Sequence, residues 1–230
     1  MKKISQLINN VKSQTSRQAI IPLHSQASEK ELKDLVVFYG KQIVPKFKLI
    51  DEFKPIYAEL FYYFTGNPKS KYDLNKGIAL IGTYGIGKTT VFRIFHEFIK
   101  QTWRFCPNLF IVSSVEDLSA ELNQKSWLNE KLTYYIHENS VGYNEKKPKH
   151  VLINEFGYQY KIKNFGTDVN ELIEAWLMKR YDIFQEYKKL THITSNFGMK
   201  DLESNFHPKI IDRFKEMFNF IPLEGKSFRK

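Results

Sequence analysis

The sequence is poor in cysteine and contains no long apolar run. Cys106 is the single cysteine among 230 residues, so no intramolecular disulfide can form and a reducing compartment is expected. No stretch approaches the ~20 apolar residues of a membrane-spanning helix, and the polar start at residues 1–6 lacks the apolar core of a secretory signal. We therefore expect a cytoplasmic protein that has no membrane partner.

Acidic side chains are also scarce relative to basic ones. The chain has 35 Lys and Arg against 25 Asp and Glu, a net charge of +10, and residues 1–48 hold nine of the basic and three of the acidic side chains. This excess favours an anionic partner such as nucleic acid or an acidic protein surface. A basic tail that only aids solubility would have the same composition.

Short apolar runs alternate with amphipathic segments along most of the chain. Strands are predicted at 77–81, 109–112, 150–153, 190–194 and 218–221. Helices are predicted at 28–39, 55–64, 90–100, 115–122, 169–187, 199–204 and 208–217, and residues 123–149 carry apolar side chains at roughly helical spacing. The alternation predicts an α/β three-layer sandwich with a mainly parallel five-stranded sheet, preceded by a helical N-terminal region.

One motif places a phosphate-binding loop between the first of these strands and its helix. Residues 82–89 match the pattern G-x-x-x-x-G-K-[ST], whose glycines let backbone N–H groups surround a polyphosphate at a helix N-terminus. Lys88 would contact the β- and γ-phosphates, and the Thr89 hydroxyl would bind Mg²⁺. An ordinary glycine-rich turn is the alternative. The predicted binding residues are Gly82, Thr83, Tyr84, Gly85, Ile86, Gly87, Lys88, Thr89 and Thr90.

Four polar residues further along the chain could complete a hydrolytic site. Glu155 follows the strand at 150–153, where it could deprotonate a water that attacks the γ-phosphate, and Asn196 follows the strand at 190–194, where it could hold that water. Arg213 could stabilise transition-state charge in a neighbouring subunit, and Arg229 could contact the phosphates. Each residue also has a plainer explanation. Glu155 could be a solvent-facing strand end and Asn196 a turn residue. Arg213 could form a surface ion pair, and Arg229 could belong to a frayed basic terminus.

The motifs GTYGIGKTT, VLINEFG, THITSNF and IIDRFKEMFNFIPLEGKSFR, in this order, resemble the DnaC-like branch of the AAA+ ATPases over about residues 50–230. That branch contains replicative helicase loaders and IstB-type transposition helpers, which bind ATP with Mg²⁺ and lack a separate C-terminal lid domain. The resemblance implies the following roles: Lys88 and Thr89 as Walker A, Glu155 as the Walker B catalytic glutamate, Asn196 as sensor 1, Arg213 as an arginine finger and Arg229 as a sensor 2-like arginine.

The Walker B pair departs from this resemblance. The family has Asp-Glu or Asp-Asp where this chain has Asn154-Glu155. An amide at Asn154 can accept a hydrogen bond from a Mg²⁺-bound water, but it cannot balance the charge of the metal. We therefore expect nucleotide binding with weak Mg²⁺ affinity and slow hydrolysis.

The resemblance also implies contacts with other macromolecules. Residues 1–50 are expected to form a basic, partly flexible partner-binding region ahead of an AAA+ ATPase domain at 51–230, and an arginine finger at Arg213 implies self-association. The region between the second and third strands is expected to contact single-stranded DNA, with Tyr143, Lys146 and Lys147 favoured. Its other aromatic and basic residues are Lys125, Trp127, Lys131, Tyr134, Tyr135 and Lys149. The alternative is that most of these aromatic side chains pack inside the protein.

Three functions remain open at the level of sequence. The first is an ATP-dependent loader or remodeller of a replicative helicase on single-stranded DNA, and the second is an IstB-type helper of a transposase. The third is a nucleotide-gated adaptor with little or no hydrolysis, which Asn154 would permit. A small-molecule kinase would leave Arg213 and Arg229 unexplained, and the absence of an N-K-x-D motif disfavours a GTPase.

Overall fold

The computed structural model describes residues 22–103, 108–118, 134–138, 144–157 and 169–228. The chain divides into two compact units, Met1–Leu74 with Thr89–Leu109 and Asn75–Lys88 with Phe110–Lys230. Within the described ranges, no helix is long and apolar enough to cross a bilayer. The domain boundary expected near residue 50 stays a prediction.

The first unit is helical. It contains the 3₁₀ turns η1 (Leu23–Ser25) and η2 (Asp51–Phe53) and the helices α2 (Glu29–Ile43), α3 (Lys54–Phe64) and α4 (Lys88–Thr102), whose first residue belongs to the other unit. Ser28 caps α2, because its hydroxyl accepts from the Glu31 N–H at 3.3 Å while the Glu31 carboxylate accepts from the Ser28 N–H at 3.1 Å. The Phe64 ring stacks on the Phe95 ring at 5.0 Å, which joins α3 to α4.

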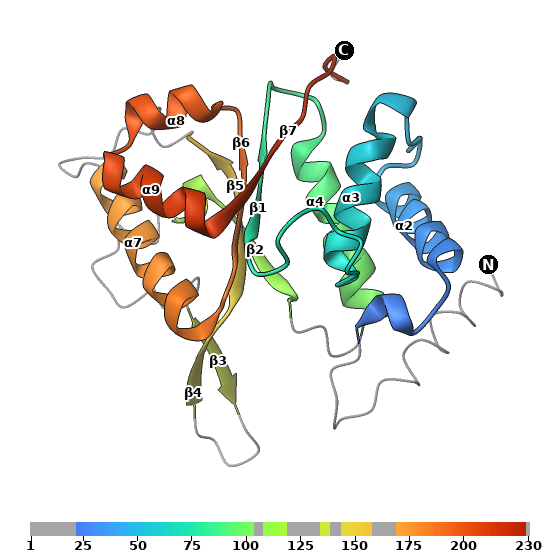
Figure 1. Cartoon of the computed structure of the whole chain (residues 1–230), viewed down its shortest axis with the longest axis horizontal. Coiled ribbons are helices and arrows are strands. Elements are labelled where there is room, and N and C mark those ends of the chain that lie inside the picture. The colour runs from blue at the N-terminus through green and yellow to red at the C-terminus, as the bar shows by residue number, and fades with distance from the viewer. Residues whose placement is uncertain (1–21, 104–107, 119–133, 139–143, 158–168, 229–230) are drawn as a thin grey trace. The chain divides into compact units, whose positions relative to one another are not determined.

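The second unit contains the predicted parallel sheet. Its strands are β1 (Gly77–Ile81), β2 (Phe110–Ser114), β5 (His150–Phe156), β6 (Thr191–Ser195) and β7 (Phe218–Pro222), in the spatial order β2-β5-β6-β1-β7, and every adjacent pair is parallel. The helices α7 (Val169–Tyr187), α8 (Met199–Asn205) and α9 (Pro208–Met217) lie together on one face of this sheet (Figure 1). The expected fold class is therefore confirmed.

An apolar core joins that helical layer to the sheet. Alternate strand residues, such as Ala79, Val151 and Ile193, point into it and are fully buried. The helices contribute larger side chains, among them Trp176 and Phe214, which are also buried. This packing fixes the strands that end at the candidate site.

The segment between β2 and β5 differs from the sequence-based expectation. Residues 115–118 are helical, but β3 (Tyr134–Glu138) and β4 (Asn144–Pro148) pair as an antiparallel hairpin, so the helical spacing was misleading over these two strands. Residues 119–133 and 139–143 lie outside the described residues. The run Tyr-Tyr-Ile at 134–136 has high strand propensity, which explains the difference. Because β5 begins at His150, the hairpin lies at the amino end of the sheet, opposite the loop that follows β1 (Figure 1).

Candidate functional site

The phosphate loop follows the carboxyl end of β1 in the conformation that its glycines allow. Gly82, Gly85 and Gly87 have φ angles of 151°, 79° and 88°, which other residues adopt only at an energetic cost. A side chain at residue 82 is also excluded sterically, because its Cβ would lie 2.1 Å from the Leu223 carbonyl oxygen. The backbone of this loop is therefore shaped for close approach of a ligand to its N–H groups.

The side chain of Lys88 lies inside this loop and is 8% exposed. Its Nζ donates to the carbonyl oxygens of Gly82 and Thr83 at 2.8 and 2.7 Å. A third bond, of 2.7 Å, goes to the Oδ1 of Asn196, which follows β6. The structure thus brings together Lys88 and Asn196, two residues that the sequence places 108 positions apart. Thr89 and Thr90 follow in the first turn of α4.

Asn154 and Glu155 lie in a β-bulge at the carboxyl end of β5. Ile153 pairs with Ile193 and Phe156 with Ser195, so two residues of β5 face the single residue Thr194 of β6. Glu155 is exposed and has a φ of 60°, a left-handed conformation that is uncommon for a residue other than glycine. The predicted strand end at Ile153 is therefore wrong by three residues, because β5 continues through the bulge to Phe156.

Two buried hydroxyls, which the sequence analysis missed, hold this bulge in place. Thr194 Oγ1 accepts from the Glu155 N–H at 3.0 Å and donates to the Asn154 Oδ1 at 3.3 Å. Ser195 Oγ donates to the Phe156 carbonyl oxygen at 2.7 Å and accepts from the Phe197 N–H at 3.0 Å. The pair Thr-Ser directly before Asn196 was the available sequence signal, but only the register of β5 against β6 shows what these hydroxyls contact.

The segment after β7 runs along the phosphate loop. The Leu223 N–H donates to the Ile81 carbonyl oxygen at 2.7 Å, and the Phe228 N–H donates to the Gly85 carbonyl oxygen at 3.0 Å. The Phe228 side chain is 56% exposed and lies beside Gly87, about 3.9 Å from the position of an added Cβ there. Arg229 lies outside the described residues, so its predicted role stays a prediction.

Arg213 packs against α7 within its own chain. Its guanidinium contacts the sulfur of Met178 and lies over the Tyr181 ring, with its Cζ 4.5 Å from the ring centre. The Tyr181 hydroxyl in turn donates to Glu216 at 3.0 Å. Among the described residues, no hydrogen bond joins Arg213 to the phosphate loop. The structure therefore does not bring Arg213 together with Lys88, Asn196 and Glu155.

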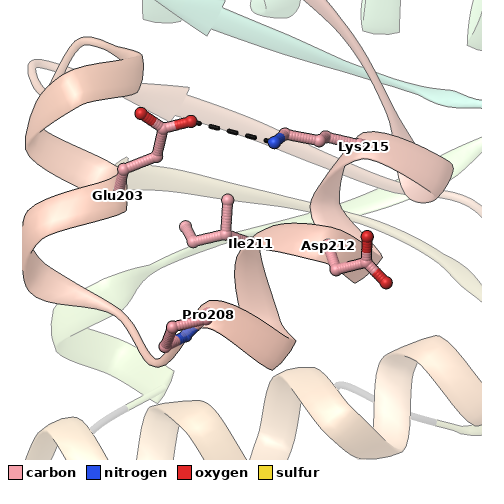
Figure 2. Close-up of a pocket in the computed structure, with 5 residues that line it drawn as sticks. All are labelled: Glu203, Pro208, Ile211, Asp212 and Lys215. Carbon is pink, nitrogen blue, oxygen red and sulfur yellow. Dashed lines mark ion pairs between the residues drawn. The ribbon is translucent and has the colours of Figure 1, made fainter.

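A pocket lies between α8 and α9. Its volume is about 290 Å³, and Figure 2 shows its lining residues, Glu203, Pro208, Ile211, Asp212 and Lys215. Lys215 and Glu203 form an ion pair of 3.8 Å across it. Because Lys215 is paired with Glu203 and Asp212 adds a second carboxylate to the lining, the pocket is a poor site for a phosphate.

A second cluster lies at the amino ends of β5 and β6. His192 Nδ1 accepts from the Ile78 N–H at 3.0 Å, and burial, assisted by His150 and Arg180, lowers the pKa of His192 to about 3. The guanidinium of Arg180 is fully buried and donates to Thr191 Oγ1 and to the carbonyl oxygens of Lys149 and Leu190, at 3.0 to 3.1 Å. The hydrogen bonds of His192 and Arg180 therefore connect neighbouring strands at the end of the sheet opposite the phosphate loop.

The residues expected to contact DNA divide between described and undescribed segments. Tyr134 and Tyr135 lie in β3, Lys146 and Lys147 lie in β4, and Lys149 follows β4. Lys125, Trp127, Lys131 and Tyr143 lie outside the described residues. The hairpin places the first group at the amino end of the sheet, so these residues belong to a surface separate from the phosphate loop.

Solved structures with the same fold were found, whereas no family model and no curated protein matches the sequence. A putative primosome component from Streptococcus pyogenes serotype M3 has 17% identity and a TM-score of 0.52 over 78% of this chain and 84% of its own. The DnaC helicase loader has 14% identity and a TM-score of 0.52 over 79% of this chain and 96% of its own. A DNA replication initiation factor has 17% identity and a TM-score of 0.50 over 78% of this chain and 48% of its own. The chain therefore shares its α/β fold with these structures, as its motifs predicted.

Proposed function

We propose that this protein binds ATP at residues 82–90, hydrolyses it slowly, and uses it to load or remodel a replicative DNA helicase on single-stranded DNA. The observation that carries the proposal is the convergence of Lys88, Asn196 and the Asn154-Glu155 bulge at the carboxyl ends of three neighbouring strands. The fold shared with a helicase loader and a primosome component supports the choice of process.

ATP fits this site because a lysine lies inside a glycine-rich loop at the N-terminus of a helix. The Lys88 Nζ donates to the carbonyl oxygens of Gly82 and Thr83 and to the Asn196 Oδ1, all of which are neutral atoms. A phosphate group would replace these contacts with hydrogen bonds in which both the donor and the acceptor are charged. Asn196 would then be released to hold a phosphate oxygen or the attacking water, while the exposed Glu155 would accept a proton from that water.

The donor set also fits a magnesium ion carried by the nucleotide. Within the described residues, no group of three His, Cys, Asp or Glu side chains could hold a metal alone. Mg²⁺ bound to nucleotides relies on phosphate oxygens and water with one or two protein oxygens. The Thr89 hydroxyl and, through water, the Asn154 Oδ1 are the protein oxygens that we assign. When bound, the ion would offset negative charge on the β- and γ-phosphates.

A nucleotide-gated adaptor is the second candidate, and Asn154 is the observation that favours it. Thr194 already donates to the Asn154 Oδ1, so this neutral oxygen has one lone pair left for a metal-bound water. Weak metal binding would slow hydrolysis while it leaves ATP binding intact. Turnover that remains undetectable in a single-turnover assay, with tight ATP binding, would favour the adaptor over the loader.

The first test measures ATP binding with a fluorescent analogue. We expect Lys88→Met to weaken binding by about 10- to 100-fold, because the charged hydrogen bonds of Lys88 to the phosphates are lost. Lys200→Met, on the exposed side of α8, is the matched control and should bind like the wild type. Equal binding by the wild type and Lys88→Met would refute the proposed site.

The second test separates the two partners that the fold permits. Purified replicative helicase, single-stranded circular DNA and ATP are mixed with the protein, and helicase bound to DNA is measured. In parallel, transposase-mediated strand transfer into duplex DNA is measured with and without the protein. Helicase loading alone supports the proposal, whereas stimulation of the transposase alone would replace it with a transposition helper.

Arg213 is proposed to act on the nucleotide of a neighbouring subunit. Because it stacks on Tyr181 in its own chain, this role requires the guanidinium to leave that ring when subunits associate. Light scattering with a non-hydrolysable ATP analogue should show larger particles for the wild type than for Arg213→Ala. Monomers of identical size in both samples would remove the role in trans.

A further inference from the structure

Thr194 is a buried polar residue that touches both members of the proposed hydrolytic pair. Its side chain lies on β6 and is 1% exposed. One hydroxyl accepts from the backbone N–H of Glu155 at 3.0 Å and donates to the Asn154 Oδ1 at 3.3 Å. Its single donor bonds to Asn154 and one of its two acceptor sites bonds to Glu155, so one hydroxyl contacts two consecutive residues of β5.

The bulge explains why such a contact is needed. The extra residue in β5 breaks the regular pairing with β6, so the Glu155 N–H bonds to a side chain instead of the strand ladder. A φ of 60° at Glu155 is unfavourable for a residue with a side chain and persists only where its surroundings impose it. The Thr194 hydroxyl is the group that accepts a hydrogen bond from the backbone N–H of Glu155.

We propose that Thr194 is a positioning residue for nucleotide hydrolysis. Its hydroxyl holds Glu155 in the left-handed conformation at the carboxyl end of β5, the edge of the sheet at which the phosphate loop also lies. Asn196, two residues further along, contacts Lys88 Nζ, so one short segment touches both the loop and Glu155. This inference rests on the proposed ATP hydrolysis.

The same hydroxyl also orients the amide of Asn154. Because Thr194 donates to the Oδ1, this oxygen is fixed toward β6. Thr194 therefore sets the positions of the proposed general base and of the oxygen assigned to the metal-bound water. Loss of the hydroxyl should affect turnover rather than the binding of the nucleotide, since Lys88 and the loop backbone do not depend on it.

The test compares three variants of the full-length chain. Thr194→Val keeps the shape of the side chain and removes both hydrogen bonds, whereas Thr194→Ser keeps the hydroxyl. Thr191→Val is the matched control, because Thr191 lies on the same strand, is 1% exposed and also loses a hydrogen bond, but lies at the other end of β6. For each protein we measure kcat, the Kd for ATP and amide hydrogen exchange in a peptide that contains Glu155.

We expect Thr194→Val to lower kcat by about 10- to 100-fold, the loss typical of a misplaced reacting group, with a Kd within about threefold of the wild type. Thr194→Ser should keep most of the wild-type kcat. Amide hydrogen exchange at Glu155 should be faster than in the wild type only in Thr194→Val. Wild-type kcat in Thr194→Val, an equal loss in Thr191→Val, or unchanged exchange at Glu155 would each overturn the inference. A wild type that hydrolyses no ATP would instead overturn the proposed hydrolysis, and the exchange rates alone would then decide whether Thr194 holds the bulge.

Discussion

Protonation of His192 should destabilise the protein well above the pH at which carboxylates titrate. This ring is fully buried on β6, its Nδ1 accepts from the Ile78 N–H, and its pKa is lowered from 6.5 to about 3. His192 is therefore protonated near pH 6.5 in the unfolded chain, whereas in the folded chain it stays neutral at that pH. Because the folded pKa lies below the unfolded one, the stability from neutral His192 is present above pH 6.5 and is lost as the pH falls toward 3.

The size of this loss follows from the two pKa values. Each pH unit between them costs up to about 1.4 kcal/mol, so from pH 7.5 to pH 5.0 the contribution of His192 falls by about 2 kcal/mol. This is a large share of the 5–15 kcal/mol that stabilises a typical domain. Urea unfolding at pH 7.5, 6.5, 5.5 and 5.0, followed by intrinsic tryptophan fluorescence, to which the buried Trp176 of the same unit contributes, measures the free energy of unfolding.

His192→Gln is the control, because its amide oxygen can still accept from the Ile78 N–H but it does not titrate. The substitution also changes packing, so the pH dependence of the free energy of unfolding is compared between the two proteins, not its absolute value. We expect the wild type to lose about 2 kcal/mol more than His192→Gln over this range, since all other titrating groups are common to both. Parallel curves for the two proteins would refute the reasoning.

Three further predictions concern the candidate site and the hairpin. Asn154→Asp should lower the Mg²⁺ concentration for half-maximal ATPase activity and raise turnover; unchanged kinetics would exclude the amide as the cause of slow hydrolysis. Gly82→Ala should destabilise the protein by about 2 kcal/mol or more in urea unfolding, because φ is 151° and the new Cβ would lie 2.1 Å from the Leu223 oxygen; Gly198→Ala, whose Cβ has 3.5 Å of clearance, should not. Replacement of Lys146 and Lys147 by Ala should flatten the salt dependence of single-stranded DNA binding by about 1.4 in log–log slope, and an unchanged slope would remove these lysines from the DNA surface.

Elements with strong periodicity could be predicted from the sequence with accurate bounds. The strand at 77–81 and the helices at 169–187 and 208–217 have the expected residues at both ends. Their signals are local: an apolar run before the glycine-rich loop, a long amphipathic face, and Pro208 in the first turn of a helix. The phosphate loop was predictable for the same reason, because its motif and both flanking elements are continuous in the sequence.

Features that depend on contacts between distant segments could not be predicted. The bulge at Glu155 requires the register of β5 against β6 and the hydroxyl of Thr194, neither of which is visible in the run Val-Leu-Ile-Asn-Glu. The hairpin of β3 and β4 was missed because aromatic residues that suit a strand also fell at roughly helical spacing. The stacking of Arg213 on Tyr181 joins two helices, and a local motif carries no information about it.

β5 connects the two surfaces to which we assign ATP and DNA. The hairpin ends one residue before this strand begins, and Glu155 lies at its far end, about 20 Å away at 3.3 Å per residue. Arg180 fastens the amino end through Lys149 and Thr191, while Thr194 fastens the carboxyl end through Glu155. A strand that is hydrogen-bonded at both ends and paired with neighbours on both sides resists local bending. DNA bound at the hairpin would therefore influence hydrolysis in one of two ways: through movement of β5 together with β2 and β6, or through contacts between subunits.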